Sequence, residues 1–160
     1  MTDFQKIIVA LSQAGVDFVI VGGLAATAHG SSRLTQDIDV VYSRAADNID
    51  RLVRSLAPFE PYLRGVPVGL PFEWSGATIE RGLNFTLTTT IGDIDLLGEI
   101  TGGGRYEDLL SHSQEMEFFG RRCKCLDLPT LVRVKRAAGR PKDLEVIAEL
   151  EALVEESERE

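Results

Sequence analysis

Residues 17–42 read DFVIVGGLAATAHGSSRLTQDIDVVY, and this stretch decides the fold of the chain. The apolar, β-branched run VDFVIV at 16–21 ends at Gly22 and Gly23, which predicts a buried strand that breaks into a tight turn. The residues after the turn predict, in order, a short helix LAATAH at 24–29, a polar loop GSSRLTQ at 30–36 and a second strand DIDVVYS at 37–43. This close alternation predicts an α/β fold with a mixed sheet and flanking helices.

The rest of the chain continues the alternation and closes with helices. Thr2 and Gln5 form a capping-box pattern, which predicts a first helix that begins there and stops at Gly15. Residues 58–76 carry four prolines and three glycines, too many breakers for a long regular element, and predict a loop region with room for one short piece of structure. The other predicted elements are a helix at 45–56, a hairpin of strands 83–90 and 93–100, a short helix near 106–112, a hairpin at 115–126 that turns at Gly120, a helix opened by Pro129 and a last helix at about 142–156.

Length and composition are those of an ordinary globular protein. With 160 residues, 44% of them apolar and 26% charged, the chain can form one core. We expect one domain, with a core at about 1–127 and a C-terminal helical segment at about 128–158. No apolar run approaches the roughly 20 residues that span a bilayer, and MTDFQK at the start lacks the features of a secretory signal. We therefore expect a cytoplasmic protein with no membrane segment.

Charge is distributed unevenly along the chain. The net charge of −8 argues against attraction of the whole surface to nucleic acid. Residues 121–142, however, contain eight basic residues and one acidic residue, whereas 143–160 contain eight acidic residues and one basic residue. We expect a local cationic patch in the first of these segments, which would suit an RNA end.

Cys123 and Cys125 are expected to be ordinary reduced cysteines. Zinc takes four ligands, and His29 and His112 have no spacing that matches the two cysteines. Two residues of separation would also strain a disulfide. The scarcity of histidine argues in addition against a metal-dependent phosphohydrolase.

Two acidic triplets, DID at 37–39 and DID at 93–95, run into aliphatic residues that look buried. Carboxylates in such a place cost several kcal/mol unless a cation or a hydrogen-bond donor compensates them. Side chains two apart on a strand point to one face, about 6.6 Å apart at ~3.3 Å per residue. Carboxylates with this spacing can hold two Mg²⁺ ions about 3.5–4 Å apart and leave positions open for phosphate oxygens. The triplets therefore predict a metal site to which a second strand adds a third carboxylate.

The sequence resembles the nucleotidyltransferase-fold superfamily, the group that includes DNA polymerase β and the minimal bacterial nucleotidyltransferases. The matching residues are VGG at 21–23, DIDV at 37–40 after thirteen intervening residues, and IDL at 94–96. The resemblance implies that Gly22 and Gly23 hold the triphosphate of a bound nucleotide.

The same resemblance implies three metal-binding, catalytic carboxylates. Asp37 and Asp39 correspond to the pair that binds two Mg²⁺ ions, and Mn²⁺ is a possible substitute. The third carboxylate, which helps to activate the acceptor, is assigned to Asp95 because aliphatic residues flank it within the strand. Asp93 follows Gly92 at the expected turn and is the reserve candidate.

Three basic residues are further candidates for nucleotide binding. Arg33 can clamp a phosphate or bond the loop to the sheet. Lys135 takes a helix position where a core residue usually stands, so it either borders the active cleft or lies along apolar surface with its amine in water. Lys142 opens the last predicted helix and can reach the same cleft.

The function that the resemblance implies is Mg²⁺-dependent transfer of a nucleoside monophosphate from a nucleoside triphosphate to a hydroxyl. The acceptor can be a tRNA end, a protein or a small molecule. Arg33, Thr35 and the segment KRAAGRPKDLE at 135–145 look most like small stand-alone bacterial members akin to the abortive-infection toxin nucleotidyltransferases, which implies a toxin–antitoxin component with a cognate antitoxin. Leu24 follows the glycine pair where many members carry a serine or a residue followed by a basic group that contacts phosphate, so the resemblance supports triphosphate binding less strongly than metal binding. The alternative is a non-catalytic binding or regulatory module of the same fold, against which three intact carboxylates argue.

Overall fold

The structure is a computed structural model that describes residues 1–67 and 69–159, without the side chain of Lys142. Its α-helices are α1 (Phe4–Gln13), α2 (Gly22–Ala28), α3 (Ala46–Leu56), α4 (Gly76–Arg81), α5 (Tyr106–Leu109), α6 (Leu128–Ala138) and α7 (Leu144–Glu158), and its 3-10 helices are η1 (Ala57–Phe59), η2 (Leu110–His112) and η3 (Pro141–Asp143). Its strands are β1 (Phe18–Val21), β2 (Asp37–Tyr42), β3 (Tyr62–Leu63), β4 (Phe85–Thr89), β5 (Gly92–Leu97), β6 (Glu99–Ile100), β7 (Gly104–Arg105), β8 (Ser113–Phe118) and β9 (Arg121–Leu126).

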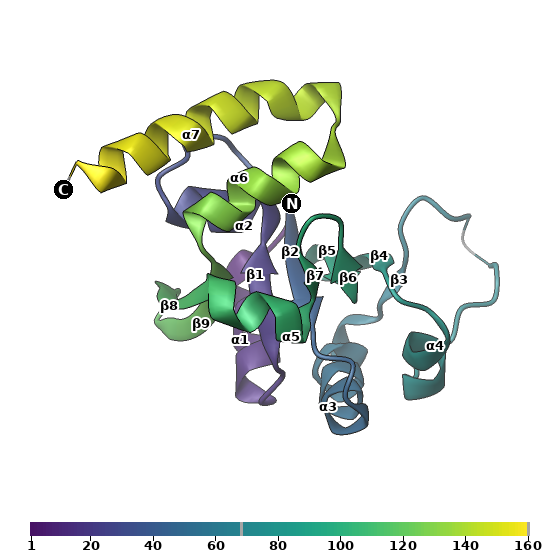
Figure 1. Ribbon diagram of the computed structural model, residues 1–160. Helices are drawn as coiled ribbons and strands as arrows, with labels where there is room; N and C mark the ends of the chain where they lie inside the picture. Colours follow the sequence, from purple (N-terminus) through teal and green to yellow (C-terminus); the bar gives the residue numbers. More distant parts are fainter. Residues whose placement is uncertain (68, 160) are drawn as a thin grey trace.

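Seven strands form one mixed sheet in the order β3–β4–β5–β2–β1–β9–β8. β2 is antiparallel to β1 but parallel to β5, and β1 is parallel to β9. The two predicted hairpins are present as the antiparallel pairs β4–β5 and β8–β9. Figure 1 shows α6 and α7 side by side at the top of the molecule, with α1 and α3 at the opposite end. The predicted class, a mixed α/β sheet with flanking and C-terminal helices, is confirmed.

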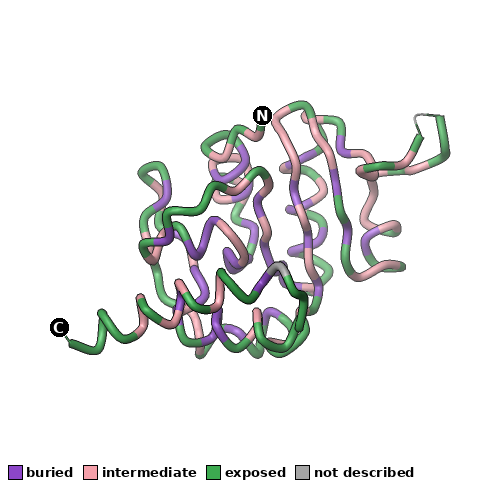
Figure 2. Tube along the Cα trace, turned by 90° about the horizontal axis from the view of Figure 1, so that it is seen from above, coloured by how far each residue is buried: buried purple, intermediate pink, exposed green. Residues whose placement is uncertain are grey.

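The central strands bury one side-chain face and leave the other half open. In β2 the side chains of Ile38 and Val40 are fully buried, whereas those of the alternating Asp37 and Asp39 are only partly covered. The same alternation holds in β5. The buried face belongs to one hydrophobic cluster that also contains the apolar stripes of α1 and α3, and Figure 2 shows the buried strands at the centre of the molecule. The pleat of β2 and β5 thus directs their carboxylates away from the core.

The predicted capping box at Thr2 is wrong. The side chain of Asp3 caps α1 instead and accepts a hydrogen bond of 3.0 Å from the backbone N–H of Lys6. The Thr2 hydroxyl donates to the backbone carbonyl of Gln36 and accepts from the backbone N–H of Asp93 at 3.1 Å. These tertiary partners draw the hydroxyl away from the helix, so Thr2 ties the N-terminal segment to the start of β5.

Regular structure interrupts the predicted loop at 58–76. β3 pairs with β4, and the backbone N–H of Arg64 continues the pairing by donating to the carbonyl of Thr86 at 3.0 Å. A two-residue strand depends on its neighbour for stability, so a local pattern does not reveal it. The last predicted helix also starts later, at Leu144, because Pro141 opens the short helix η3 first. Among residues 1–67 and 69–159 no helix has the length and apolar character needed to cross a bilayer.

Candidate metal centre and nucleotide cleft

Three aspartates converge where β2 lies beside β5. The parallel register of these strands places Asp39 opposite Asp95 and Asp37 opposite Asp93. One carboxylate oxygen from each of Asp37, Asp39 and Asp95 lies within 4.8 Å of the others. The structure therefore brings together the three residues that the sequence singled out, and leaves the reserve candidate Asp93 outside the group.

Burial makes this cluster suited to a cation. Asp39 Oδ1 and Asp95 Oδ1 are buried and have no hydrogen-bond partner of good geometry. Burial raises the pKa of Asp39 to about 8, and the negative charges of Asp95 and Asp37 add to the effect. The pKa of Asp37 is also raised, by burial first and then by the charge of Asp95. Because two oxygen atoms lack partners and divalent cations such as Mg²⁺ prefer hard oxygen ligands, the residues present fit a metal site.

The glycine pair allows the turn after β1 to approach this cluster closely. Gly22 has a φ of +67°, and a Cβ atom there would lie only 2.1 Å from Asp39 Oδ2. A Cβ atom on Gly23 would lie 2.7 Å from the hydroxyl oxygen of Thr35. The start of α2 therefore packs directly against the carboxylate cluster and against the loop before β2, which explains why Gly22 and Gly23 lack a side chain.

A cleft of about 390 Å³ opens over the cluster. Besides Asp37, Asp39 and Asp95, its lining includes Gly23, Arg33, Thr35, Lys135, Arg140 and Asp143. Its walls come from β2, β5, the turn at α2, and the helices α6 and α7. A cleft of this composition combines carboxylates at its base with cationic side chains at its rim.

The C-terminal wall of the cleft is organised by Asp143, whose side chain is only 4% exposed. Arg140 donates to it from Nε at 2.8 Å, and Lys135 Nζ lies 3.5 Å from its Oδ1 atom. Burial alone would raise the pKa of Asp143, but the hydrogen bond from Arg140 and the charge of Lys135 lower it. Lys135 lines the cleft, which agrees with the first of the two interpretations of its sequence position, a place at the border of the active cleft.

The structure describes the side chain of only one of the two remaining predicted nucleotide contacts, Arg33 and Lys142. Arg33 lines the cleft, but its guanidinium pairs with Glu149 at 3.1 Å and with Glu145 at 3.5 Å on α7. This pairing ties the loop before β2 to the last helix, the second of the two roles that the sequence left open. The predicted contact by Lys142 lies outside the described side chains.

The cationic patch expected at 121–142 is partly neutralised within the chain. Four of its basic residues form ion pairs, which are Arg122 with Glu115, Arg136 with Glu151, and both Lys135 and Arg140 with Asp143. Arg133 donates instead to the backbone carbonyl of Gly102. The compensating charge comes from Glu115 on β8, Asp143 on η3 and Glu151 on α7, which the linear segment did not predict.

Arg64 is a residue of the site that the sequence analysis missed. It follows β3, and its guanidinium lies 3.0 Å from Asp95 Oδ1, 3.5 Å from Asp93 Oδ2 and 3.6 Å from Asp37 Oδ2. The contact with Asp95 has the distance of a hydrogen bond but not its direction, which is consistent with Asp95 Oδ1 lacking a partner. The sequence around Arg64 gave no signal for this role, because Arg64 reaches the cluster only through the pairing of β3 with β4.

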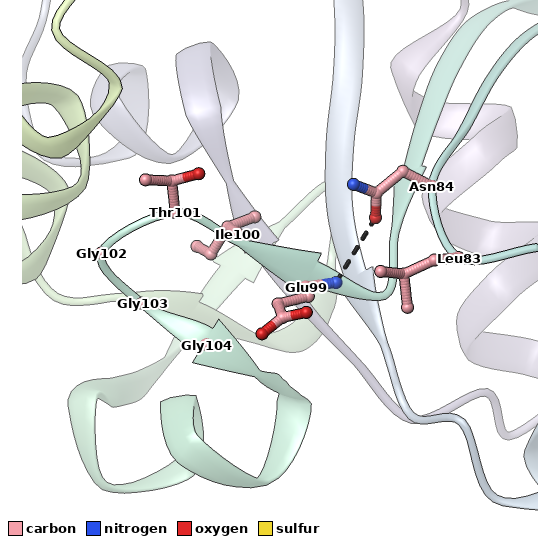
Figure 3. A pocket seen from close by; sticks show the side chains of 8 residues that line it. All are labelled: Leu83, Asn84, Glu99, Ile100, Thr101, Gly102, Gly103 and Gly104. Carbon is pink, nitrogen blue, oxygen red and sulfur yellow. Dashed lines mark hydrogen bonds between the residues drawn. The ribbon is translucent and has the colours of Figure 1, made fainter.

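A second hollow of about 410 Å³ lies beside the β6–β7 turn, and Figure 3 shows its lining residues. Asn84 Oδ1 accepts from the backbone N–H of Gly98 at 2.8 Å, and its longer contact to Glu99 is drawn in the figure. The remaining wall is mostly the glycine turn at 102–104, which packs against α6. Among the described lining residues only Glu99 is ionisable, so this hollow has no set of groups for phosphoryl-transfer chemistry.

Comparison with solved structures confirms that the chain has the nucleotidyltransferase fold. The lincosamide antibiotic adenylyltransferase LnuA, in its lincomycin-bound form, superposes with a TM-score of 0.62 at 14% identity, over 95% of this chain and 98% of that chain. The antibiotic-resistance factor ANT(2″)-Ia, in complex with adenylyl-2″-tobramycin, gives a TM-score of 0.58 at 14% identity, over 92% and 90% of the two chains.

A third similar structure is TM1012 of Thermotoga maritima, a candidate nucleotidyltransferase, with a TM-score of 0.58 at 17% identity over 91% of this chain and 88% of that chain. No protein-family model matches the sequence, and no curated protein matches it. At these identities the likenesses establish the fold, and the activity has to be argued from the site.

Proposed function

We propose that this protein is a Mg²⁺-dependent nucleotidyltransferase that moves a nucleoside monophosphate from a nucleoside triphosphate to a hydroxyl group. The observation that carries the proposal is the convergence of Asp37, Asp39 and Asp95 on a nucleotidyltransferase fold, with two buried oxygen atoms that have no partner. A protein that used the fold only as a binding module would have no need to hold three carboxylates together at this energetic cost.

In this proposal the cleft binds the triphosphate between its acidic base and its cationic rim. The backbone at Gly22 and Gly23 and the amine of Lys135 hold the phosphates, since all three lie beside the carboxylate cluster. Two Mg²⁺ ions bound by Asp37, Asp39 and Asp95 would neutralise the phosphate charge, as divalent ions do in related phosphoryl-transfer chemistry. Arg33 keeps the loop before β2 in place through its pairs with α7.

The reaction then follows from the position of Asp95. Its carboxylate takes the proton of the acceptor hydroxyl, and the acceptor oxygen forms a bond to the α-phosphorus. The bond between the α-phosphorus and the bridging oxygen to the β-phosphate breaks, so pyrophosphate leaves with the electron pair of that bond. The nucleoside monophosphate remains on the acceptor.

We infer that the acceptor is a small molecule and not a tRNA end or a protein. LnuA was solved with lincomycin and ANT(2″)-Ia with adenylyl-2″-tobramycin, and both chains superpose on nearly the full length of this one. The net charge of −8, and the ion pairs of four of the eight basic residues at 121–142, disfavour binding to a nucleic acid. A toxin role with a cognate antitoxin stays a prediction of the sequence resemblance.

Calorimetric titration with each of the four ribonucleoside triphosphates in Mg²⁺ tests the proposal. One triphosphate should bind, and Asp37→Asn and Asp39→Asn should each abolish that binding. Asp50→Asn is the matched control, because Asp50 is an exposed α3 residue paired with Arg54, and it should leave the binding unchanged. If no triphosphate binds, or if the two site variants bind as well as the wild type, the proposal is wrong.

A further inference from the structure

The positive charge of Arg64 lies beside the carboxylates that we propose as metal ligands, where it would repel a bound cation. Its guanidinium contacts Asp37 and Asp95, which belong to the carboxylate cluster, and also Asp93, which does not. The directed hydrogen bond of this group goes to the backbone carbonyl of Leu87 at 2.7 Å, while Nε is buried with no hydrogen-bond partner. The arginine is therefore held among the carboxylates by charge and not by the paired hydrogen bonds of a fork-like contact.

We propose that Arg64 is a positioning residue that acts as the resident counter-ion of the metal centre. Before a divalent cation binds, Arg64 compensates Asp37 and Asp95; when the cation binds, Arg64 leaves these two carboxylates and stays with Asp93. This inference rests on the proposed function, because it takes Asp37, Asp39 and Asp95 as the metal ligands.

Competition for the same oxygen atom is the first argument for this exchange. Asp95 Oδ1 is both the carboxylate oxygen nearest to Arg64, at 3.0 Å, and a buried atom without a directed hydrogen bond. A divalent cation that this oxygen binds at about 2.1 Å, the usual distance for Mg²⁺, repels a guanidinium that lies only 3.0 Å from the same atom. Cation binding must therefore include the cost of moving Arg64.

The position of Asp93 supplies the second argument. It stands opposite Asp37 in the β2–β5 register, and Thr2 holds its backbone N–H. Its Oδ2 atom lies 3.5 Å from Arg64 Nε. Together with the Leu87 carbonyl it keeps an anchor for the guanidinium outside the cluster of three. The second DID triplet thus has two separate tasks, metal binding by Asp95 and retention of Arg64 by Asp93.

Mn²⁺ binding followed by electron paramagnetic resonance tests the proposal without any substrate. Arg64→Ala should bind Mn²⁺ roughly tenfold more tightly than the wild type, because a unit positive charge is removed from beside the bound cation. Arg54→Ala is the matched control: Arg54 pairs with Asp50 on exposed α3, so this variant changes the net charge equally and should leave the affinity unchanged. An Arg64→Ala affinity equal to that of the wild type would overturn the proposal.

A double-mutant cycle tests the role of Asp93. Asp93→Asn should weaken Mn²⁺ binding several-fold when Arg64 is present, because Asp37 and Asp95 are then the only carboxylates left to pair with Arg64, and most of this effect should disappear in the Arg64→Ala background. An equal loss in both backgrounds would mean that Asp93 acts on the cation directly and would overturn the proposed anchor.

Thermal unfolding gives an independent measure and separates the two possible failures. Without added cation Arg64→Ala should unfold at a lower temperature than the wild type, and saturating Mn²⁺ should close most of that gap. If Mn²⁺ binds and Asp37→Asn abolishes the binding while Arg64→Ala changes neither affinity nor unfolding temperature, this inference fails and the proposed function stands. If neither the wild type nor Arg64→Ala binds Mn²⁺, both fail.

Discussion

Substitution of Gly22 by alanine should damage both the stability of the protein and its cation binding. The backbone of Gly22 is left-handed, with a φ of +67°, which costs a non-glycine residue about 1 kcal/mol. The new Cβ atom would lie 2.1 Å from Asp39 Oδ2 and 2.8 Å from its Cγ, well inside contact distance. Overpacking of this kind costs about 1–3 kcal/mol. We therefore expect Gly22→Ala to lower the free energy of unfolding by about 2–4 kcal/mol.

The same clash should displace the Asp39 carboxylate by more than about 1 Å, since a Cβ atom and a carboxylate oxygen need roughly 3.4 Å. Urea unfolding and Mn²⁺ binding measure the two effects. Gly120→Ala is the matched control, because Gly120 has a φ of +80° and a Cβ atom added there would have no neighbour within 4 Å; it should lose only the backbone cost of about 1 kcal/mol and no cation affinity. If Gly22→Ala costs no more than Gly120→Ala and binds Mn²⁺ normally, the packing of the turn against Asp39 has been misjudged.

Three further predictions concern charge and burial. The pKa of Asp39 is raised to about 8, so the native state binds more protons than the unfolded state between pH 3.8 and 8. With a chelator present, the free energy of unfolding of the wild type should therefore fall as pH rises through this window, and Asp39→Asn should flatten that profile in urea unfolding. The affinity for a divalent cation should rise with pH over the same window. Asp143→Asn should cost about 2 kcal/mol in thermal unfolding, less than a fully buried pair because Arg140 is half exposed; an unchanged unfolding temperature would contradict this. Asn48→Ala should cost about 3 kcal/mol, because Asn48 is fully buried and exchanges two hydrogen bonds with the backbone of Asp17, yet it should leave Mn²⁺ binding intact.

The parts of the fold that local pattern controls were predictable. The period-two alternation around Asp37 and Asp39 correctly indicated which side chains share a face, and the aliphatic residues that flank Asp95 favoured it over Asp93. Glycine turns correctly marked both hairpins. These signals succeed because each depends on residues that are neighbours in the sequence.

The parts that depend on distant partners were not predictable. Arg64 belongs to the carboxylate cluster only because β3 adds to the edge of the sheet beside β4. Thr2 matched a helix cap, but its hydroxyl found partners at the starts of β2 and β5. The cationic run at 121–142 predicted a patch, but Glu151 of α7 and the buried Asp143 pair with three of its eight basic residues. In each case the energy of a tertiary contact outweighs the local preference.

The most direct test of the central claim follows the label of a nucleoside triphosphate. Each of the four triphosphates, labelled at the α- or the γ-phosphate, is incubated with the protein, Mg²⁺ and a panel of hydroxyl-bearing small molecules. We expect one triphosphate to transfer its α-label to an acceptor and to release its γ-label in pyrophosphate, and we expect Asp95→Asn to abolish both events. Transfer of the γ-label to the acceptor, or transfer that survives Asp95→Asn unchanged, would contradict the central claim.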